Sequence, residues 1–98
     1  MEKTFRLYIG ADNTTGQVSI ENVTQVLKDF SIEGATFINT IGLWGGELEK
    51  SLVVETTQMF HNEKSLAAFA EKLCKKLCEK LGQDCVGYMV LPKINFIS

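Results

Sequence analysis

Polar side chains that could bind a small molecule recur in the first strand-like segment and again in the middle of the sequence. They are Arg6, Tyr8, Thr40, Ser51 and Glu55. An arginine guanidinium binds phosphate or carboxylate through two parallel hydrogen bonds, and hydroxyl groups and an aromatic ring can hold the rest of such a ligand. These residues therefore predict a site for a small anionic ligand. The alternative is an Arg6–Glu55 pair across two strands of a solvated or subunit-covered sheet.

Two further aromatic residues could belong to this site. Trp44 is the only tryptophan, and it directly precedes Gly45-Gly46. A tryptophan at a hairpin tip is a typical anchor for a partner protein or a planar ligand, although its ring could also fold back onto its own sheet. Tyr88, in the last strand-like segment, is expected to join the same surface. The candidate ligand-binding residues are thus Arg6, Tyr8, Thr40, Trp44, Ser51 and Glu55.

The histidine and the cysteines form no recognised catalytic or metal-binding pattern. His61 has no nucleophile or orienting group beside it in the sequence, which favours a surface or capping role. The spacing of Cys74, Cys78 and Cys85 matches no standard zinc motif, and cysteine is among the most commonly buried residues. We therefore predict three core or near-core thiols, no catalytic residue, no metal and no cofactor.

The composition sets limits on the class of protein. The chain has 98 residues, 45% hydrophobic and 22% charged, with a net charge of −2 and a pI of about 5.3. This length predicts one domain over residues 1–98, and the lack of a basic excess argues against a nucleic-acid partner. Apolar runs are too short to span a bilayer, and the first residues do not resemble a secretory signal, so we expect a cytoplasmic protein without a membrane partner.

The elements that must position the candidate site are predicted from periodicity and end signals. Strands are expected over residues 4–10, 35–44, 47–59 and 85–91, and helices over residues 19–30 and 62–81. Ser19 and Asn62 are predicted helix N-caps, and Gly82 is a natural helix end. A tail over residues 93–98 carries Ile94, Phe96 and Ile97 and is a further surface for self-association.

The Gly45-Gly46 pair predicts a tight hairpin, because primed turns need positive φ angles at both central positions. A two-residue loop places Trp44 opposite Glu47. One hairpin face then carries Phe37, Ile41, Leu43, Leu48, Leu52 and Val54, and it is expected to meet the helices. The other carries Thr36, Ile38, Thr40, Ser51, Val53 and Glu55. This mixed face must be wet, or covered by another chain.

The element order is β-α-β-β-α-β, which predicts an α+β, ferredoxin-like domain: a four-stranded antiparallel sheet with two helices on one face. The combination of Tyr8-Ile9-Gly10 after the first strand with the hairpin from Gly42-Leu43-Trp44-Gly45 to residues 49–55 resembles short uncharacterised ferredoxin-like proteins of bacteria and phages. The layout is more distantly similar to the PII and CutA trimer-forming domains. This resemblance implies self-association with small ligands held between subunits. The long ligand-binding loop of PII is replaced here by the glycine turn, so no residue role is carried over.

These observations favour a non-enzymatic, homo-oligomeric module that binds a small anionic, nucleotide-like ligand. A phage-encoded version would sequester a nucleotide signal of host immunity. One alternative is a protein-interaction or inhibitor module that acts through the Trp44 hairpin. Another is a small enzyme with Glu55 as general base, which requires a buried Glu55 carboxylate.

Overall fold

The computed structural model describes residues 1–12, 15–83, 86–92 and 97, apart from the Trp44 side chain. Its elements are β1 (Glu2–Gly10), α1 (Ile20–Asp29), β2 (Thr36–Trp44), β3 (Glu47–Met59), α2 (Glu63–Leu81) and β4 (Gly87–Leu91). The predicted order of strands and helices is confirmed. The first strand begins two residues earlier than predicted. The last begins at Gly87, and Cys85, where it was expected to start, lies outside the described residues, as do Ile94 and Phe96 of the tail.

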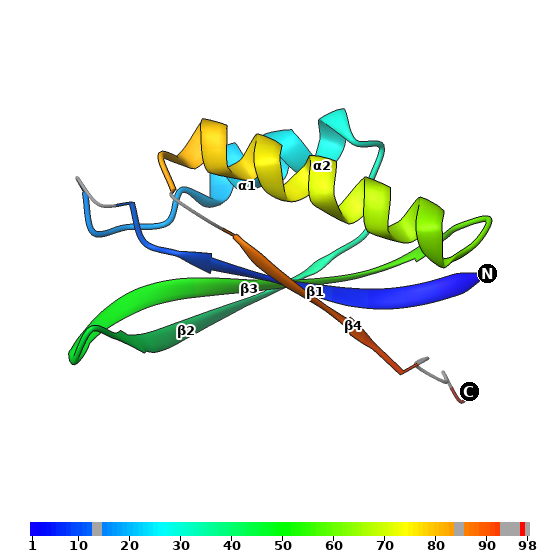
Figure 1. Cartoon of the computed structure of the whole chain (residues 1–98). Coiled ribbons are helices and arrows are strands. Elements are labelled where there is room, and N and C mark those ends of the chain that lie inside the picture. The colour runs from blue at the N-terminus through cyan, green and yellow to red at the C-terminus, as the bar shows by residue number, and fades with distance from the viewer. Residues whose placement is uncertain (13–14, 84–85, 93–96, 98) are drawn as a thin grey trace.

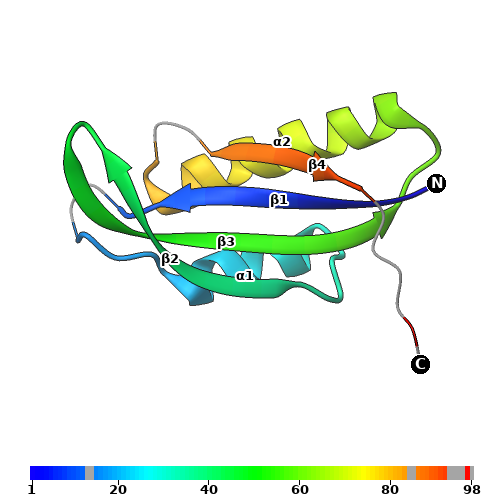
Figure 2. The ribbon, with the colours of Figure 1, turned by 90° about the horizontal axis from the view of Figure 1, so that it is seen from below.

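The four strands form one antiparallel sheet in the order β2-β3-β1-β4. Both helices cover the same face of this sheet, and the opposite face is open (Figure 1). Seen from the open side, α2 lies behind β1 and β4, whereas α1 lies behind β2 and β3 (Figure 2). This is the predicted ferredoxin-like α+β fold, in which one helix follows each inner strand, β1 and β3, and both helices cover one face of the sheet.

The helix ends lie where the sequence signals place them. The Ser19 hydroxyl accepts a hydrogen bond from the Asn22 amide at 3.2 Å, and the Asn62 side chain accepts one from the Ser65 amide at 2.8 Å. Gly82 ends α2 with a φ of 65°, a left-handed conformation that glycine adopts without steric cost. These caps satisfy backbone groups that a helix end leaves unpaired, so they fix where each helix starts and stops.

The core lies between the helices and the covered sheet face. Alternate residues of β1 (Phe5, Leu7 and Ile9) are almost wholly buried, as are Leu52 and Val54 of β3. They meet the apolar stripes of the helices, which include Val23, Val26, Leu27, Leu66, Leu73 and Leu77. Phe5, Phe30, Phe60 and Phe69 form an aromatic group at one end, with ring centroids 5.5 to 6.3 Å apart. The alternation of β1 therefore sends its polar residues to the open face.

The hairpin of β2 and β3 has the predicted register, with Trp44 opposite Glu47 and Thr36 opposite Glu55. Gly45 and Gly46 have φ angles of 56° and 81°, as a primed turn requires. The prediction that its whole apolar face meets the helices is wrong in part. Near the turn Ile41, Leu43 and Leu48 are 72%, 67% and 74% exposed, because the hairpin extends past the helices that cover its base (Figure 1).

Candidate open-face ligand site

The strand register brings most of the predicted ligand-binding residues onto the open face of the sheet, which faces the viewer in Figure 2. Arg6 lies opposite Glu55 across β1 and β3, and Tyr8 lies opposite Val53. Thr40 lies opposite Ser51 across β2 and β3. Because side chains alternate between the two faces, all of these groups point away from the helices. They occupy successive rows of one surface, which we call the open-face site.

Arg6 and Glu55 form an ion pair in this site. Arg6 Nε donates to Glu55 Oε1 at 2.7 Å, and the two side chains are 39% and 20% exposed. The hydrogen bond with Glu55, and secondarily one with Tyr8, raises the pKa of Arg6, so the guanidinium stays charged. The cross-strand pair considered as an alternative is therefore present. It presents a positive and a negative group side by side, next to an aromatic ring.

Thr40 and Ser51 form the second polar pair of the open face. Their hydroxyl oxygens are 2.5 Å apart, within hydrogen-bond distance across β2 and β3. The row between this pair and the ion pair contains Tyr8, Val53 and Ile38, which are partly exposed. An apolar and aromatic strip thus lies between charged groups on one side and hydroxyl groups on the other.

A cavity of about 260 Å³ opens where this strip meets the hydroxyl pair. It is lined by Tyr8, Ile9, Gly10, Thr40, Ile41, Gly42, Ser51, Leu52 and Val53. Gly10 and Gly42 contribute backbone and no side chain to this lining. This hollow was not predicted from the sequence, since it depends on two glycines that the register aligns on one face.

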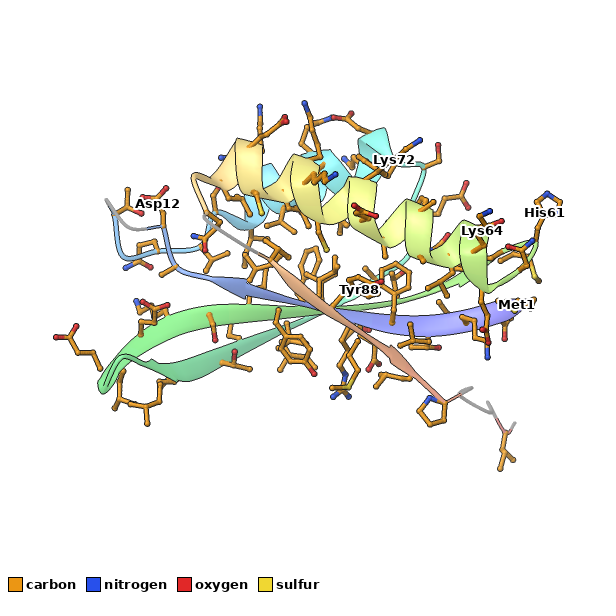
Figure 3. All side chains as sticks on the ribbon, viewed as in Figure 1. Met1, Asp12, His61, Lys64, Lys72 and Tyr88 are labelled. Atoms are coloured by element: carbon orange, nitrogen blue, oxygen red, sulfur yellow. The ribbon has the colours of Figure 1, made fainter. Side chains whose placement is uncertain are left out.

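Two aromatic candidates do not belong to the described site. The prediction that Tyr88 joins it is wrong: Gly87 lies opposite Tyr8, so Tyr88, one residue later, lies opposite Leu7 on the helix-covered side. There Tyr88 lines a pocket together with residues of α2 (Figure 3). Trp44 ends β2 in the last row of the hairpin, and its side chain lies outside the described part of the structure.

His61, Cys74 and Cys78 lie away from the open face. His61 is exposed just before α2, at the opposite end of the molecule from Asp12 (Figure 3). Cys74 and Cys78 lie on α2, and burial raises the pKa of Cys74 to about 11, with a smaller contribution from Cys78. Cys85 falls outside the described residues. Within residues 1–12, 15–83, 86–92 and 97, no cluster of His, Cys, Asp and Glu could hold a metal, and no helix could span a membrane.

A second cavity, of about 300 Å³, lies between the loop after β1 and the end of α2. Its lining combines the apolar residues Val18 and Leu81 with polar residues that include Asp12, Thr15, Gln17, Asn22, Lys80 and Gln83. Gly10 borders both cavities, and a Cβ atom at this position would lie 3.2 Å from Glu49 Oε1 and 3.3 Å from Gln83 Oε1. The polar composition of residues 11–17 was the only sequence signal for this cavity, and it equally indicates an ordinary loop.

No protein-family model matches the sequence, and no curated protein matches it either. Solved structures show the fold. A phage SAM lyase in complex with S-methyl-5'-thioadenosine is 19% identical, with a TM-score of 0.73 over 92% of this chain and 80% of the lyase chain. The divalent cation tolerance protein CutA1 of Thermus thermophilus is 13% identical, with a TM-score of 0.59 over 99% of this chain and 88% of that one. Arabidopsis thaliana PII bound to citrate is 15% identical, with a TM-score of 0.54 over 93% and 78%.

Proposed function

We propose that this protein is a homo-oligomeric binding module that holds a small nucleotide-like ligand on the open face of its sheet. The observation that carries this proposal is the cavity in which Tyr8, Thr40 and Ser51 converge, with the Arg6–Glu55 ion pair in the next row beyond Tyr8 and Val53. Small-molecule sites usually combine an apolar hollow with a few convergent polar groups. The open-face site has both.

Each part of a nucleotide has a matching group in this site. The Tyr8 ring and Val53 offer an aromatic and an apolar surface for a base. Arg6 suits a phosphate or carboxylate, because its guanidinium is always charged and its planar fork can donate two parallel hydrogen bonds. Glu55 accepts hydrogen bonds, as do the hydroxyls of Thr40 and Ser51, so ribose hydroxyl groups can be satisfied nearby.

The compared structures support this ligand class. The phage lyase structure contains a thioadenosine, and the Arabidopsis PII structure contains citrate, an anion. A nucleotide combines a nucleoside with an anionic group. In the open-face site the aromatic strip suits the nucleoside, and Arg6 suits the anionic group. This likeness concerns the fold of those proteins, and the ligand assigned to this chain rests on its own side chains.

Exposed apolar side chains support self-association. On the open face Tyr8, Ile38 and Met89 are 37%, 40% and 51% exposed. On the helix-facing side of the hairpin, Ile41, Leu43 and Leu48 are each more than 60% exposed. Apolar surface of this extent commonly marks an interaction site, and covering it with a second copy removes it from water.

Titration calorimetry with two probes tests the ligand assignment. We expect AMP to bind the wild-type protein, and S-methyl-5'-thioadenosine, which lacks the phosphate, to bind more weakly. Tyr8→Ala should weaken both probes, whereas Arg6→Ala should weaken AMP selectively. Lys72→Ala, on the solvent side of α2 (Figure 3), serves as the control. Failure of the wild-type protein to bind either probe would refute the proposed ligand class.

Catalysis is a second candidate function, because the phage neighbour is named as a lyase. A general base works best as a carboxylate held apart from cations in apolar surroundings. Glu55 is instead ion-paired with Arg6 and 20% exposed on its side chain, which favours binding over catalysis. Chromatography of probes after incubation with the protein separates the two: unchanged AMP and S-methyl-5'-thioadenosine support a binding module, and a new product would support an enzyme.

A further inference from the structure

Two cavities lie at the end of β1, and Gly10 lines both of them. The open-face cavity, which contains Tyr8 and the Thr40–Ser51 pair, has a volume of about 260 Å³. The other, which we call the loop cavity, lies between the loop after β1 and the end of α2 and has a volume of about 300 Å³. Small-molecule sites usually enclose about 300–1,000 Å³, so each cavity alone is at the lower limit of this range and the two together lie within it.

The loop cavity offers hydrogen-bond donors that suit a carboxylate. Lys80, in the last turn of α2, borders it and is exposed, and among the described residues no ion pair engages Lys80. Thr15 and Ser19 accept hydrogen bonds from backbone amides through their hydroxyl oxygens, so each hydroxyl group can still donate to a ligand. An ammonium group and two hydroxyl groups in one lining favour an anionic partner.

The loop cavity also contains an acidic residue, which lies on the loop that follows β1 (Figure 3). This residue is Asp12, and its Oδ1 accepts a hydrogen bond from the Thr15 amide at 3.0 Å, so the carboxylate helps to hold the loop. A second ammonium group lies next to the lining, because Lys50 donates to Gln17 Oε1 at 3.3 Å. With Lys80 on α2, two positive groups therefore compensate for the charge of Asp12.

Two hydrogen-bond acceptors flank the strand end that borders both cavities. A Cβ atom at Gly10 would lie 3.2 Å from Glu49 Oε1 and 3.3 Å from Gln83 Oε1, so both oxygens lie beside the Gly10 backbone. Gln83 Nε2 donates to the Ala11 carbonyl at 2.6 Å, which holds this amide in place. Carboxylate and amide oxygens accept hydrogen bonds. A ligand that crosses Gly10 therefore needs an N–H or O–H group at this point.

The spacing along β1 sets the length of a ligand that uses both cavities. Arg6 and Gly10 are four residues apart, which is about 13 Å at the ordinary rise of an antiparallel strand, and Lys80 lines the cavity beyond this strand end. A nucleotide with its phosphate at Arg6 and its base at Tyr8 has the far edge of its base at Gly10. A second acidic group joined to that edge through an N–H group then falls in the loop cavity.

We propose that the two cavities form one elongated site, and that its ligand is a nucleotide with a second acidic group linked to its base through an N–H group. This inference rests on the proposed function, because it keeps the phosphate at Arg6 and the base on the open face. Glu49 and Gln83 provide acceptors for the linking N–H group, and Lys80 binds the second acid. Gly10 determines specificity, because a side chain there would stand where the link crosses the strand end.

Calorimetric titration with adenylosuccinate, which is AMP with a succinate joined through its N6–H group, tests the elongated site. We expect the wild-type protein to bind it about tenfold more tightly than AMP, as one added charge-assisted contact provides. N6-propyl-AMP, which has a neutral chain on the same nitrogen, should show no such gain. Lys80→Ala should bring the ratio of adenylosuccinate affinity to AMP affinity close to one. Lys80→Arg, which keeps the charge, should largely retain this ratio, and Lys72→Ala should leave it unchanged.

Gly10→Ala provides a second variant, at the strand end itself. The φ angle of Gly10 is not positive, and the two atoms nearest to an added Cβ are the ends of flexible side chains. We therefore expect a folded protein by circular dichroism. The affinity ratio should fall in this variant as it does in Lys80→Ala, because the added methyl group obstructs the link and not the second acid.

The same titrations separate this inference from the proposed function. Equal affinities of the wild-type protein for AMP and adenylosuccinate would overturn the elongated site and leave the AMP assignment intact. A gain that persists in Lys80→Ala or in Gly10→Ala would place the succinyl group outside the loop cavity, and a gain reproduced by N6-propyl-AMP would assign it to apolar contact, so either result also overturns the elongated site. Failure of both nucleotides to bind would refute the proposed ligand class and this inference with it.

Discussion

Arg6 and Glu55 lie directly opposite each other on β1 and β3, and their side chains meet at 2.7 Å on the open face of the sheet. The pair is separated by 49 residues in sequence and is brought together by the strand register alone. Because the pair is partly exposed and lies close to the cavity, its effect on folding stability can be measured separately from its effect on ligand binding.

Removal of Arg6 should affect binding far more than folding. The ion pair is partly exposed, and pairs of this kind contribute little to the free energy of unfolding because water competes for both charges. We expect Arg6→Ala to shift the urea midpoint only slightly while reducing AMP affinity at least about tenfold, as loss of a charge-assisted contact does. Leu73→Ala, at a fully buried core position, provides the contrast, with an expected loss of about 2–5 kcal/mol. A midpoint shift in Arg6→Ala as large as that in Leu73→Ala would assign the pair a structural role instead.

The Thr40–Ser51 pair should show a difference between single and double replacement. Ser51→Ala leaves the Thr40 hydroxyl without its partner on a partly buried surface and should cost about 1 kcal/mol. The double change Thr40→Val with Ser51→Ala removes both hydroxyls and should be closer to wild type in urea unfolding. Both versions should weaken AMP binding if the hydroxyls contact the ligand. Wild-type affinity in the double variant would remove this pair from the site.

The glycine turn should tolerate little change. Gly45 and Gly46 have positive φ angles, and a side chain in that region costs about 1–2 kcal/mol per residue. We expect Gly45→Ala and Gly46→Ala each to lower the free energy of unfolding by about 1 kcal/mol. Gly34→Ala is the matched control, because a Cβ atom there meets nothing within 4 Å and its φ is not positive. Equal effects at all three positions would argue against a conformational cause.

Alkaline pH should destabilise the protein partly through Cys74. Burial, with a smaller effect of Cys78, raises the pKa of Cys74 from 9.0 to about 11. The unfolded chain therefore loses this proton first as the pH rises. The contribution of Cys74 to stability is complete below about pH 9 and is lost as the pH rises toward about 11. We expect a slope of at most about 1 kcal/mol per pH unit, since nearby solvent reduces the effect.

Urea midpoints measured across this pH range check the prediction for Cys74. The packing cost of the substitution changes the free energy of unfolding by the same amount at every pH, so it does not affect the slope of stability against pH. Cys74→Val should therefore show a shallower decline than wild type, whatever its starting stability. Identical slopes would show that Cys74 does not titrate as proposed. As a separate check, a soluble alkylating reagent should modify the half-buried Cys78 before the buried Cys74.

Much of the fold could be predicted because its signals are local. Ser19, Asn62 and Gly82 fix helix ends through backbone groups within a few residues, and Gly45-Gly46 fixes the hairpin register through its turn. The neighbouring positions of β1 and β3 follow from the topology. Together these features were enough to bring Arg6 opposite Glu55, which is the centre of the candidate site.

The features that were predicted wrongly or missed depend on contacts between elements that are far apart in the sequence, and short sequence motifs do not encode these contacts. Tyr88 was placed on the wrong face because the parity of β4 is set by its pairing with β1 and not by its own sequence. The exposure of Ile41 and Leu43 depends on how far the helices reach along the hairpin. The cavity needs Gly10 and Gly42 on adjacent parts of one surface, and this alignment follows only from the complete sheet.

The inner position of β1 has a consequence for how the chain is made. β1 precedes both of its ladder partners in the sequence: β3 follows after residue 46, and β4 follows after residue 86. Until β3 has been made, Phe5, Leu7 and Ile9 have no strand beside them, and α1 is the one core helix available to cover them, so the emerging chain carries an unpaired apolar strand. Folding through such late, long-range pairings is slow compared with folding through local contacts. The period of greatest vulnerability to aggregation thus falls during translation, before β4 has emerged.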